Sequence, residues 1–237
     1  TFGKGLVQTT RQLSYNAQLK VTTAKYYIPS GRCIQALDYA NRNEDGTVDK
    51  VADSLRSEFK TKNGRKVYDG NGIDPDVIVE DEYLGTVTVA LLQDRFIFDF
   101  ASKYCGEHPT IPDLKSFKLS DAEYAKFLDW IKAQKFTYAT ALETSTEELM
   151  EAAKHERYYS ELESQLTDLK KKIEANKATD LVRFKKEITE ILEQQIAFHY
   201  ALAEGQAIVS LPQDKAVLEA QRVLTDQNKY KNILSPR

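Results

Sequence analysis

The sequence predicts an α+β protein in which a β-rich segment is followed by an all-helical one. Between residues 6 and 35, β-forming residues alternate with polar ones, which is typical of strands with one buried face. From Thr86 onward, apolar residues recur at steps of three and four, the period of helices that pack on one side. This change of pattern predicts two domains, 1–85 and 86–237.

The first strands are predicted to form a β-hairpin. Two alternating runs surround a short turn at residues 15–17. Asn16 is the expected left-handed turn residue, because its short polar side chain tolerates a positive φ. A Pro-Ser-Gly turn at 29–31 ends this unit, and residues 33–35 are predicted to form a short strand after it.

Residues 38–71 are polar and rich in turn-forming residues. An insertion of this length in a compact domain is usually functional or folded on itself. Its later part, SEFKTKNGRKVY, is predicted to form a hairpin that turns at Asn63-Gly64. The next segment, GIDPDVIVE, is predicted to end in a short buried strand at 77–79.

The helical segment is predicted to begin with one apolar helix over about 86–104. Ser120 is the expected N-cap of the next helix, since Glu123 follows at the capping-box spacing. Pro212 is expected to precede the last helix.

A long antiparallel helical hairpin is predicted after the first helices. Residues 146–175 form one long charged helix with an a/d seam for a single partner helix. A second helix is expected to follow the NKATD connection, capped by Thr179 or Asp180, and to pair with the first. The predicted seam consists of Tyr159, Leu162, Leu166, Leu169 and Ile173.

Composition excludes several classes of function. The net charge of −3 gives no basic face for nucleic acid, and no apolar run reaches the roughly 18 residues that a membrane span needs. Cys33 and Cys105 have no metal-ligand spacing and are expected to be unpaired. NRNEDGTVDKVA begins like a calcium loop, but Ala52 stands where a bidentate Glu is required. His199 is expected to be a packed, hydrogen-bonded histidine. We therefore expect no cofactor and no metal.

The stretch TFGKGLVQ places Lys4 between two glycines. It is not a phosphate-binding P-loop, because Gly5 stands where that loop needs Ser or Thr. Two further blocks follow in order, LKVTTAKYYIPSGRCIQ and GIDPD. Together the three blocks resemble the C-terminal processing peptidases, also called tail-specific proteases, over residues 1–80. The helical region resembles the C-terminal extension of one bacterial branch of this family.

The resemblance implies a crotonase-like peptidase core with a serine–lysine dyad. It assigns Lys4 as the catalytic general base and Gln8 as its orienting neighbour. A lysine accepts a serine proton only when neutral, and burial away from water lowers an ammonium pKa toward the suitable range of about 7–8. Phe2 is expected to supply an apolar wall, while Gly3 and Gly5 are expected to let the backbone approach the nucleophile.

In this family the nucleophilic serine and a PDZ domain precede the lysine, so both would lie before Thr1. The serines near the motif blocks stand in a different sequence context; they are Ser14, Ser30, Ser54 and Ser57. We therefore expect the C-terminal portion of a serine endopeptidase that cleaves proteins near their C-termini and is inactive by itself. The resemblance also implies protein or peptide substrates and a periplasmic location in the bacterial cell envelope.

Two other interpretations stay open. In the first, the helical region 86–237 is an assembly or adaptor-docking module that forms a homo-oligomer or binds an adaptor lipoprotein. In the second, the whole protein is an inactive relative that acts as a scaffold. For the active enzyme, the hairpin at 6–27 is expected to offer an edge for a substrate strand.

Overall fold

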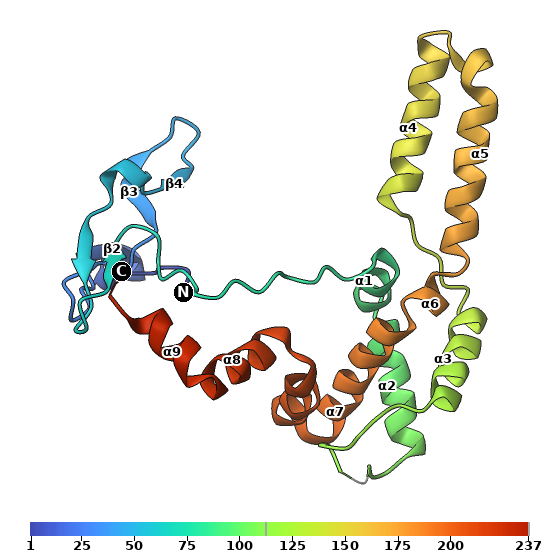
Figure 1. Ribbon diagram of the computed structural model, residues 1–237. Coiled ribbons are helices and arrows are strands. Elements are labelled where there is room, and N and C mark those ends of the chain that lie inside the picture. Colours follow the sequence, from blue (N-terminus) through green and yellow to red (C-terminus); the bar gives the residue numbers. More distant parts are fainter. Residues whose placement is uncertain (112, 237) are drawn as a thin grey trace. The chain divides into compact units, whose positions relative to one another are not determined.

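A computed structural model describes residues 1–111 and 113–236. It contains small antiparallel sheets and several helices, so the predicted α+β class is confirmed (Figure 1). The chain forms two compact units. The β-rich unit comprises Thr1–Val79 together with the chain from Glu219 onward, and the helical unit comprises Glu80–Leu218.

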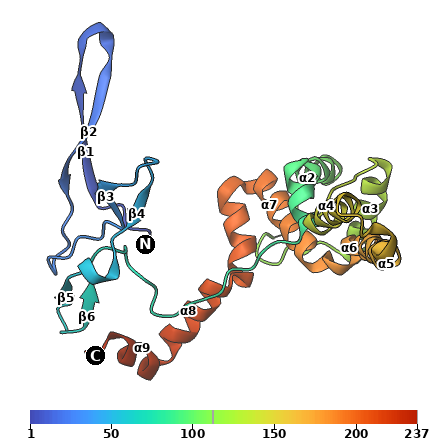
Figure 2. The same cartoon turned by 90° about the horizontal axis from the view of Figure 1, so that it is seen from above.

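The predicted first hairpin is confirmed. Strands β1 (Leu6–Gln12) and β2 (Gln18–Lys25) pair antiparallel and form a long ribbon in Figure 2. A 3-10 turn, η1 (Ser14–Asn16), joins them, and Asn16 has the expected left-handed backbone with φ 56°. Nearly all residues of both strands are exposed, so pairing between the two strands, rather than burial, defines this ribbon.

The insertion folds on itself as two further hairpins. Strand β3 (Leu37–Arg42) pairs with β4 (Val48–Lys50), and β5 (Glu58–Lys60) pairs with β6 (Lys66–Tyr68). The second of these turns around Gly64, whose φ is 81°, as the Asn-Gly pair predicts. A 3-10 turn, η2 (Asp53–Leu55), lies between them.

Two strand predictions in this unit are wrong. Residues 33–35 form no strand: the Ile34 carbonyl accepts one bond from the Gly72 amide, and Gln35 accepts from the Gly5 amide through its side chain, so no backbone ladder forms. Residues 77–79 are not a strand either, and Ile78 is 81% exposed. Three β-forming residues need a paired neighbour strand to be buried, and none of the described segments provides one.

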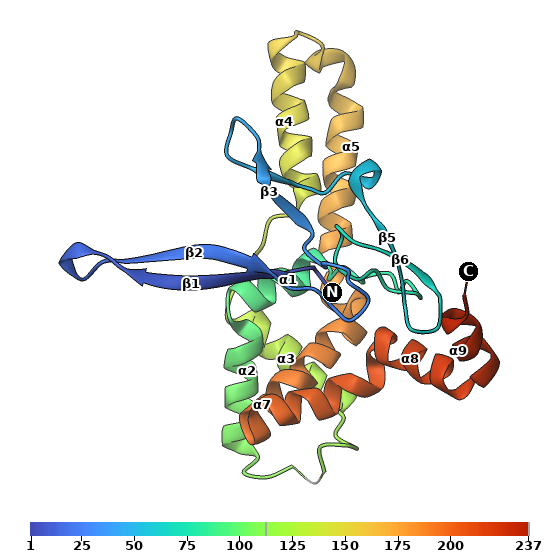
Figure 3. The same cartoon turned by 90° about the vertical axis from the view of Figure 1, so that its left-hand side faces the viewer.

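The core of the helical unit lies between four helices that surround one apolar cluster. These are α1 (Thr86–Gln93), α2 (Phe96–Glu107), α3 (Asp121–Ala133) and α7 (Lys185–Ser210). Figure 3 shows α2, α3 and α7 around this core. Aromatic rings fill much of it: Phe127 is fully buried and lies 5.0 Å from the ring of Phe100.

The prediction of one helix over 86–104 is wrong, because the chain breaks between α1 and α2. Arg95 adopts a left-handed backbone with φ 66°, which ends one helix and starts the next in a new direction. The Arg95 guanidinium lies over the Phe98 ring at 5.0 Å. Ser120 caps α3 as predicted, accepting a hydrogen bond from the Glu123 amide at 3.2 Å.

The predicted helix over 146–175 is also wrong. It is two helices, α4 (Ala141–His155) and α5 (Tyr159–Lys177), joined where Arg157 has φ 66°. These two helices pack on each other, so α5 has α4 as its hairpin partner, not the helix after NKATD. Of the predicted seam, only Leu166 and Ile173 are buried.

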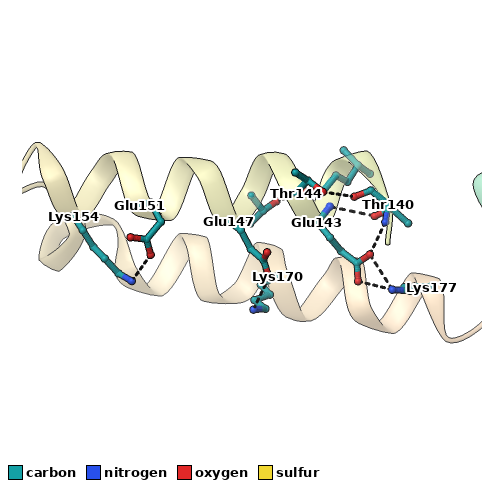
Figure 4. A network of polar contacts seen from close by, with 10 residues as sticks. Thr140, Glu143, Thr144, Glu147, Glu151, Lys154, Lys170 and Lys177 are labelled. Atoms are coloured by element: carbon teal, nitrogen blue, oxygen red, sulfur yellow. Dashed lines mark hydrogen bonds and ion pairs between the residues drawn. The ribbon is translucent and has the colours of Figure 1, made fainter. Parts of the chain in front are cut away.

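A polar network reinforces the open end of the α4–α5 hairpin (Figure 4). Thr140 and Glu143 form a complete capping box at the start of α4. The Glu143 carboxylate also accepts two hydrogen bonds from Lys177 Nζ at 2.8 and 2.9 Å. This lysine lowers the pKa of Glu143.

The connection after α5 departs from its prediction. Thr179 precedes helix α6 (Asp180–Arg183) at the N-cap position, but its hydroxyl donates backward to the Asn176 carbonyl at 2.8 Å and does not cap the helix. Asp180 instead accepts a hydrogen bond from the Tyr138 hydroxyl at 2.6 Å.

The chain ends in short helices. Pro212 lies in a 3-10 turn, η3 (Leu211–Gln213), and α8 (Lys215–Thr225) follows it as predicted. Helix α9 (Gln227–Leu234) is the last element, capped by Asp226. No helix of the described residues combines the length and the apolarity that crossing a bilayer requires.

Candidate active site

Backbone hydrogen bonds fix the TFGKG segment on both sides of Lys4. The Gly3 carbonyl accepts from the Ala36 amide at 2.9 Å, and the Gly5 carbonyl accepts from the Tyr26 amide at 2.8 Å. The Gly5 amide donates to the Gln35 side-chain oxygen at 2.8 Å. The segment that carries Lys4 is therefore held by the chain on either side of the Pro-Ser-Gly turn.

The GIDPD block joins the same cluster. The Gly72 amide donates to the Ile34 carbonyl at 3.1 Å, and the Ile73 amide donates to the Thr1 carbonyl at 3.1 Å. The three sequence blocks that are far apart along the chain thus meet around residues 1–5.

The glycines of these blocks allow the close contact between their backbones. Gly3 has φ 96°, and a β-carbon there would clash with the Ile34 carbonyl oxygen. A β-carbon on Gly5 would lie only 2.8 Å from the Gln35 amide nitrogen. A β-carbon on Gly72, whose φ is 67°, would likewise clash with the Thr1 carbonyl oxygen. These glycines therefore position Lys4, whereas their expected approach to a nucleophile stays a prediction.

Lys4 and Gln8 line the same pocket, whose volume is about 660 Å³. Lys4 is exposed, so the burial expected of a lysine base is absent here. Its Nζ lies 5.8 Å from the centre of the Phe2 ring, which forms an exposed apolar wall on one side. Gln8 Nε2 donates to Thr22 Oγ1 at 3.5 Å, and no hydrogen bond between Gln8 and Lys4 occurs among the described residues.

Part of the pocket lining comes from the insertion, and the sequence did not predict it. Tyr39 and Arg42 of β3 line the pocket, together with Gln35. In a regular strand Arg42 would face away from Leu37 and Tyr39. The pairing of β3 with β4 shifts register between Leu37 and Arg42, and such irregularities redirect a side chain. No sequence signal marks this shift.

None of the described serines lines this pocket. Ser30 has a buried hydroxyl without a hydrogen-bond partner, but it lies in the tight turn closed by the Ile28 and Arg32 backbone. Ser14 lies in η1 at the far end of the β1–β2 ribbon, and Ser54 lies in η2. The chain thus brings Lys4 and Gln8 to one pocket, with no serine of the described residues beside them.

The other candidate sites are structural. Cys33 and Cys105 are free thiols, as predicted. His199 is packed as predicted, with Nδ1 2.8 Å from the Gln195 carbonyl and Nε2 3.0 Å from Ser102 Oγ. The segment that begins like a calcium loop is the β3–β4 turn, where Asp45 accepts from the Thr47 amide at 2.9 Å. No cluster of three metal-ligating side chains occurs in the part of the chain that the structure describes.

Two models of known protein families match the chain. A model of the C-terminal helical domain of probable PDZ-proteases matches residues 87–224, which is more than half of the chain. A model of peptidase family S41 matches residues 1–40, including Lys4, Gln8 and the Pro-Ser-Gly turn. No curated protein and no solved structure shows a significant match. The chain therefore belongs to the probable PDZ-protease family, and its two matched regions support the C-terminal processing peptidase that its sequence blocks predict.

Proposed function

We propose that this chain supplies the general base of a serine endopeptidase that cleaves proteins near their C-termini in the bacterial cell envelope. The observation that carries the proposal is the meeting of three distant sequence blocks around Lys4, with Gln8 in the same pocket. These contacts fix the backbone on both sides of Lys4, so its exposed side chain starts from a defined position at the pocket. They suit a side chain whose position must be reproduced within fractions of an ångström.

In the proposed reaction, neutral Lys4 Nζ accepts the proton of a serine hydroxyl while the serine Oγ attacks the peptide carbonyl carbon. The resulting ammonium then returns this proton to the leaving amine as the peptide C–N bond breaks. Gln8 positions the amine, since its side-chain oxygen accepts from the N–H groups of either protonation state and leaves the lone pair of the neutral amine for the serine proton. The serine comes from a segment outside these 237 residues, consistent with the lack of a described serine in the pocket.

The assay compares these 237 residues with a longer polypeptide that contains them and the serine-bearing segment. Casein hydrolysis and labelling by a fluorophosphonate probe should be absent for the chain by itself and present for the longer one. Lys4→Ala in the longer polypeptide should abolish both, and Gln8→Ala should lower turnover. Lys62, which is exposed in the β5–β6 turn, gives the control Lys62→Ala, which should retain activity. Turnover by the chain alone, or undiminished turnover after Lys4→Ala, would falsify the assignment.

A second function is proposed for the helical unit, that of an assembly module. Four leucines of the α4–α5 hairpin remain exposed, and they form two pairs spaced by seven residues. They are Leu142 and Leu149 on α4, at 67% and 50% exposure, and Leu162 and Leu169 on α5, at 40% and 42%. Seven-residue spacing places each pair on one helix face, as in helices that associate with further helices.

Sedimentation velocity of the full chain tests this second function. A dimer or larger assembly that Leu149→Glu converts to monomer supports pairing of the leucine faces between copies. Glu148→Gln, on the neighbouring exposed position, is the control and should leave the assembly unchanged. A monomer at all concentrations would rule out self-assembly through this hairpin.

A further inference from the structure

The pocket around Lys4 carries more positive charge than a general base requires. We infer that Lys20 and Arg42 bind a carboxylate of the peptide substrate and so favour acidic or C-terminal segments. That the ligand is a peptide rests on the proposed function. Both kinds of segment present a carboxylate, which belongs either to an Asp or Glu side chain or to the C-terminus of the peptide.

The charge of the pocket is unbalanced. Lys4, Lys20 and Arg42 line it, and none of its described lining residues is acidic. The carboxylate of Asp38 lines the adjoining pocket instead, where it accepts from Asn41 Nδ2 at 2.7 Å. Cations that converge without a counter-charge concentrate positive potential in a concave site, which attracts anions.

Arg42 is presented in a form suited to a carboxylate. The register shift in β3 brings it into the pocket beside Tyr39, and its guanidinium carbon lies 5.8 Å from the centre of that ring. Contact with an aromatic ring uses the face of the guanidinium and leaves the N–H groups at its edge available. Those groups match the two oxygens of a carboxylate.

Lys20 lies on the β1–β2 ribbon and also lines the pocket. It pairs with Thr10, two residues along β2 from the Gln8–Thr22 pair, so Lys20 shares a face with Thr22 and Gln8. Lys4 must be neutral to act as the base. A substrate carboxylate is therefore assigned to the two other cations, which hold the peptide without taking part in proton transfer.

The ribbon provides a matched control for this assignment. Arg11 neighbours Thr10 on β1, so alternation places it on the opposite face of the same hairpin, and it does not line the pocket. Arg11→Gln therefore removes the same charge as Arg42→Gln from an exposed site outside the pocket. Lys62→Gln serves the same purpose for Lys20→Gln.

The experiment is an NMR titration of the 237-residue chain with three N-acetylated octapeptides of otherwise identical sequence. The first has an internal Glu and an amidated C-terminus, the second has Gln and a free C-terminal carboxylate, and the third has Gln and an amide. At least one carboxylate peptide should bind about ten-fold more tightly than the uncharged one. The stronger of the first two identifies the source of the carboxylate. Added salt should weaken the carboxylate peptides selectively.

Arg42→Gln and Lys20→Gln should each remove most of this preference, whereas Arg11→Gln and Lys62→Gln should retain it. Arg42→Lys, which keeps the charge but not the planar fork, should restore part of it. Equal binding of all three peptides, no binding at millimolar concentration, or an equal loss from Arg11→Gln would overturn the inference. Because no turnover is measured, these outcomes are independent of whether Lys4 is the base.

Discussion

Truncation of Glu193 tests how the helical unit is held together. This α7 carboxylate is 3% exposed. It accepts from the Leu119 amide at 2.8 Å and from Lys118 Nζ at 2.8 Å. Glu193→Ala leaves the Leu119 amide buried without a partner, which costs about 1–3 kcal/mol. The ion pair adds at most about 1 kcal/mol, because Lys118 is 62% exposed. The expected loss of unfolding free energy is therefore about 3 kcal/mol, including a small cavity.

Glu193→Gln separates these contributions. The glutamine keeps the volume and an oxygen that accepts from the Leu119 amide, so it should cost only about 1 kcal/mol. Glu148→Ala, at an exposed position of α4, should change stability by less than about 0.5 kcal/mol.

Urea unfolding followed by tryptophan fluorescence measures these changes in the helical unit. Trp130 is the single tryptophan of the chain, and it packs against the core of the helical unit, 5.6 Å from the Phe100 ring. Equal losses for Glu193→Ala and Glu193→Gln would refute the central role given to the Leu119 amide. A loss below about 0.5 kcal/mol for Glu193→Ala would refute the whole estimate.

Three further changes test other parts of the structure. Gly3→Ala should speed hydrogen exchange of the Ala36 amide about ten-fold, because φ 96° and the Ile34 carbonyl both disfavour a β-carbon; unchanged exchange would show that the cluster adapts. Phe127→Ala should cost about 3–5 kcal/mol in the same urea assay, since its ring is fully buried. Glu143→Gln should reduce the loss of stability on acidification. Lys177 lowers the folded-state pKa of Glu143, so this pair stabilises the chain above the unfolded pKa of about 4.3 and is lost as pH falls below it. Parallel pH–stability curves for Glu143→Gln and the unaltered chain would contradict this.

Hairpins and motif blocks were predictable because their signals are local. Asn63-Gly64 specifies a turn by itself, and alternation specifies the β1–β2 pair. The capping box of Thr140 and Glu143 also has a local signature, and it marks the start of α4 that the predicted helix over 146–175 lacks.

The helix breaks were not predictable from local signals. Arg95 and Arg157 both adopt left-handed backbones, although neither is a glycine or an asparagine. Arginine is a good helix former, so propensity favours continuing each helix through these positions. At Arg95, burial of α1 and α2 in the core with the distant α7 decides the outcome. At Arg157, the packing of α4 on α5 decides it. The merging of α4 and α5 into one predicted helix then gave α5 the wrong partner.

Some residues of the site can likewise be predicted from nearby sequence, and others depend on distant parts of the chain. Lys4 and Gln8 follow from one eight-residue block, but Arg42 enters the pocket only through a register shift within β3. The position of Lys4 depends in turn on the backbone of residues 34–36 and of Gly72, which pack against the glycines beside it. A change in those distant blocks can therefore displace the proposed base without touching it. Loss of activity in such a variant would show that the reaction needs Lys4 to be placed precisely. Loss of activity after Lys4→Ala would show that the reaction needs the amine itself. These are separate requirements of the same site.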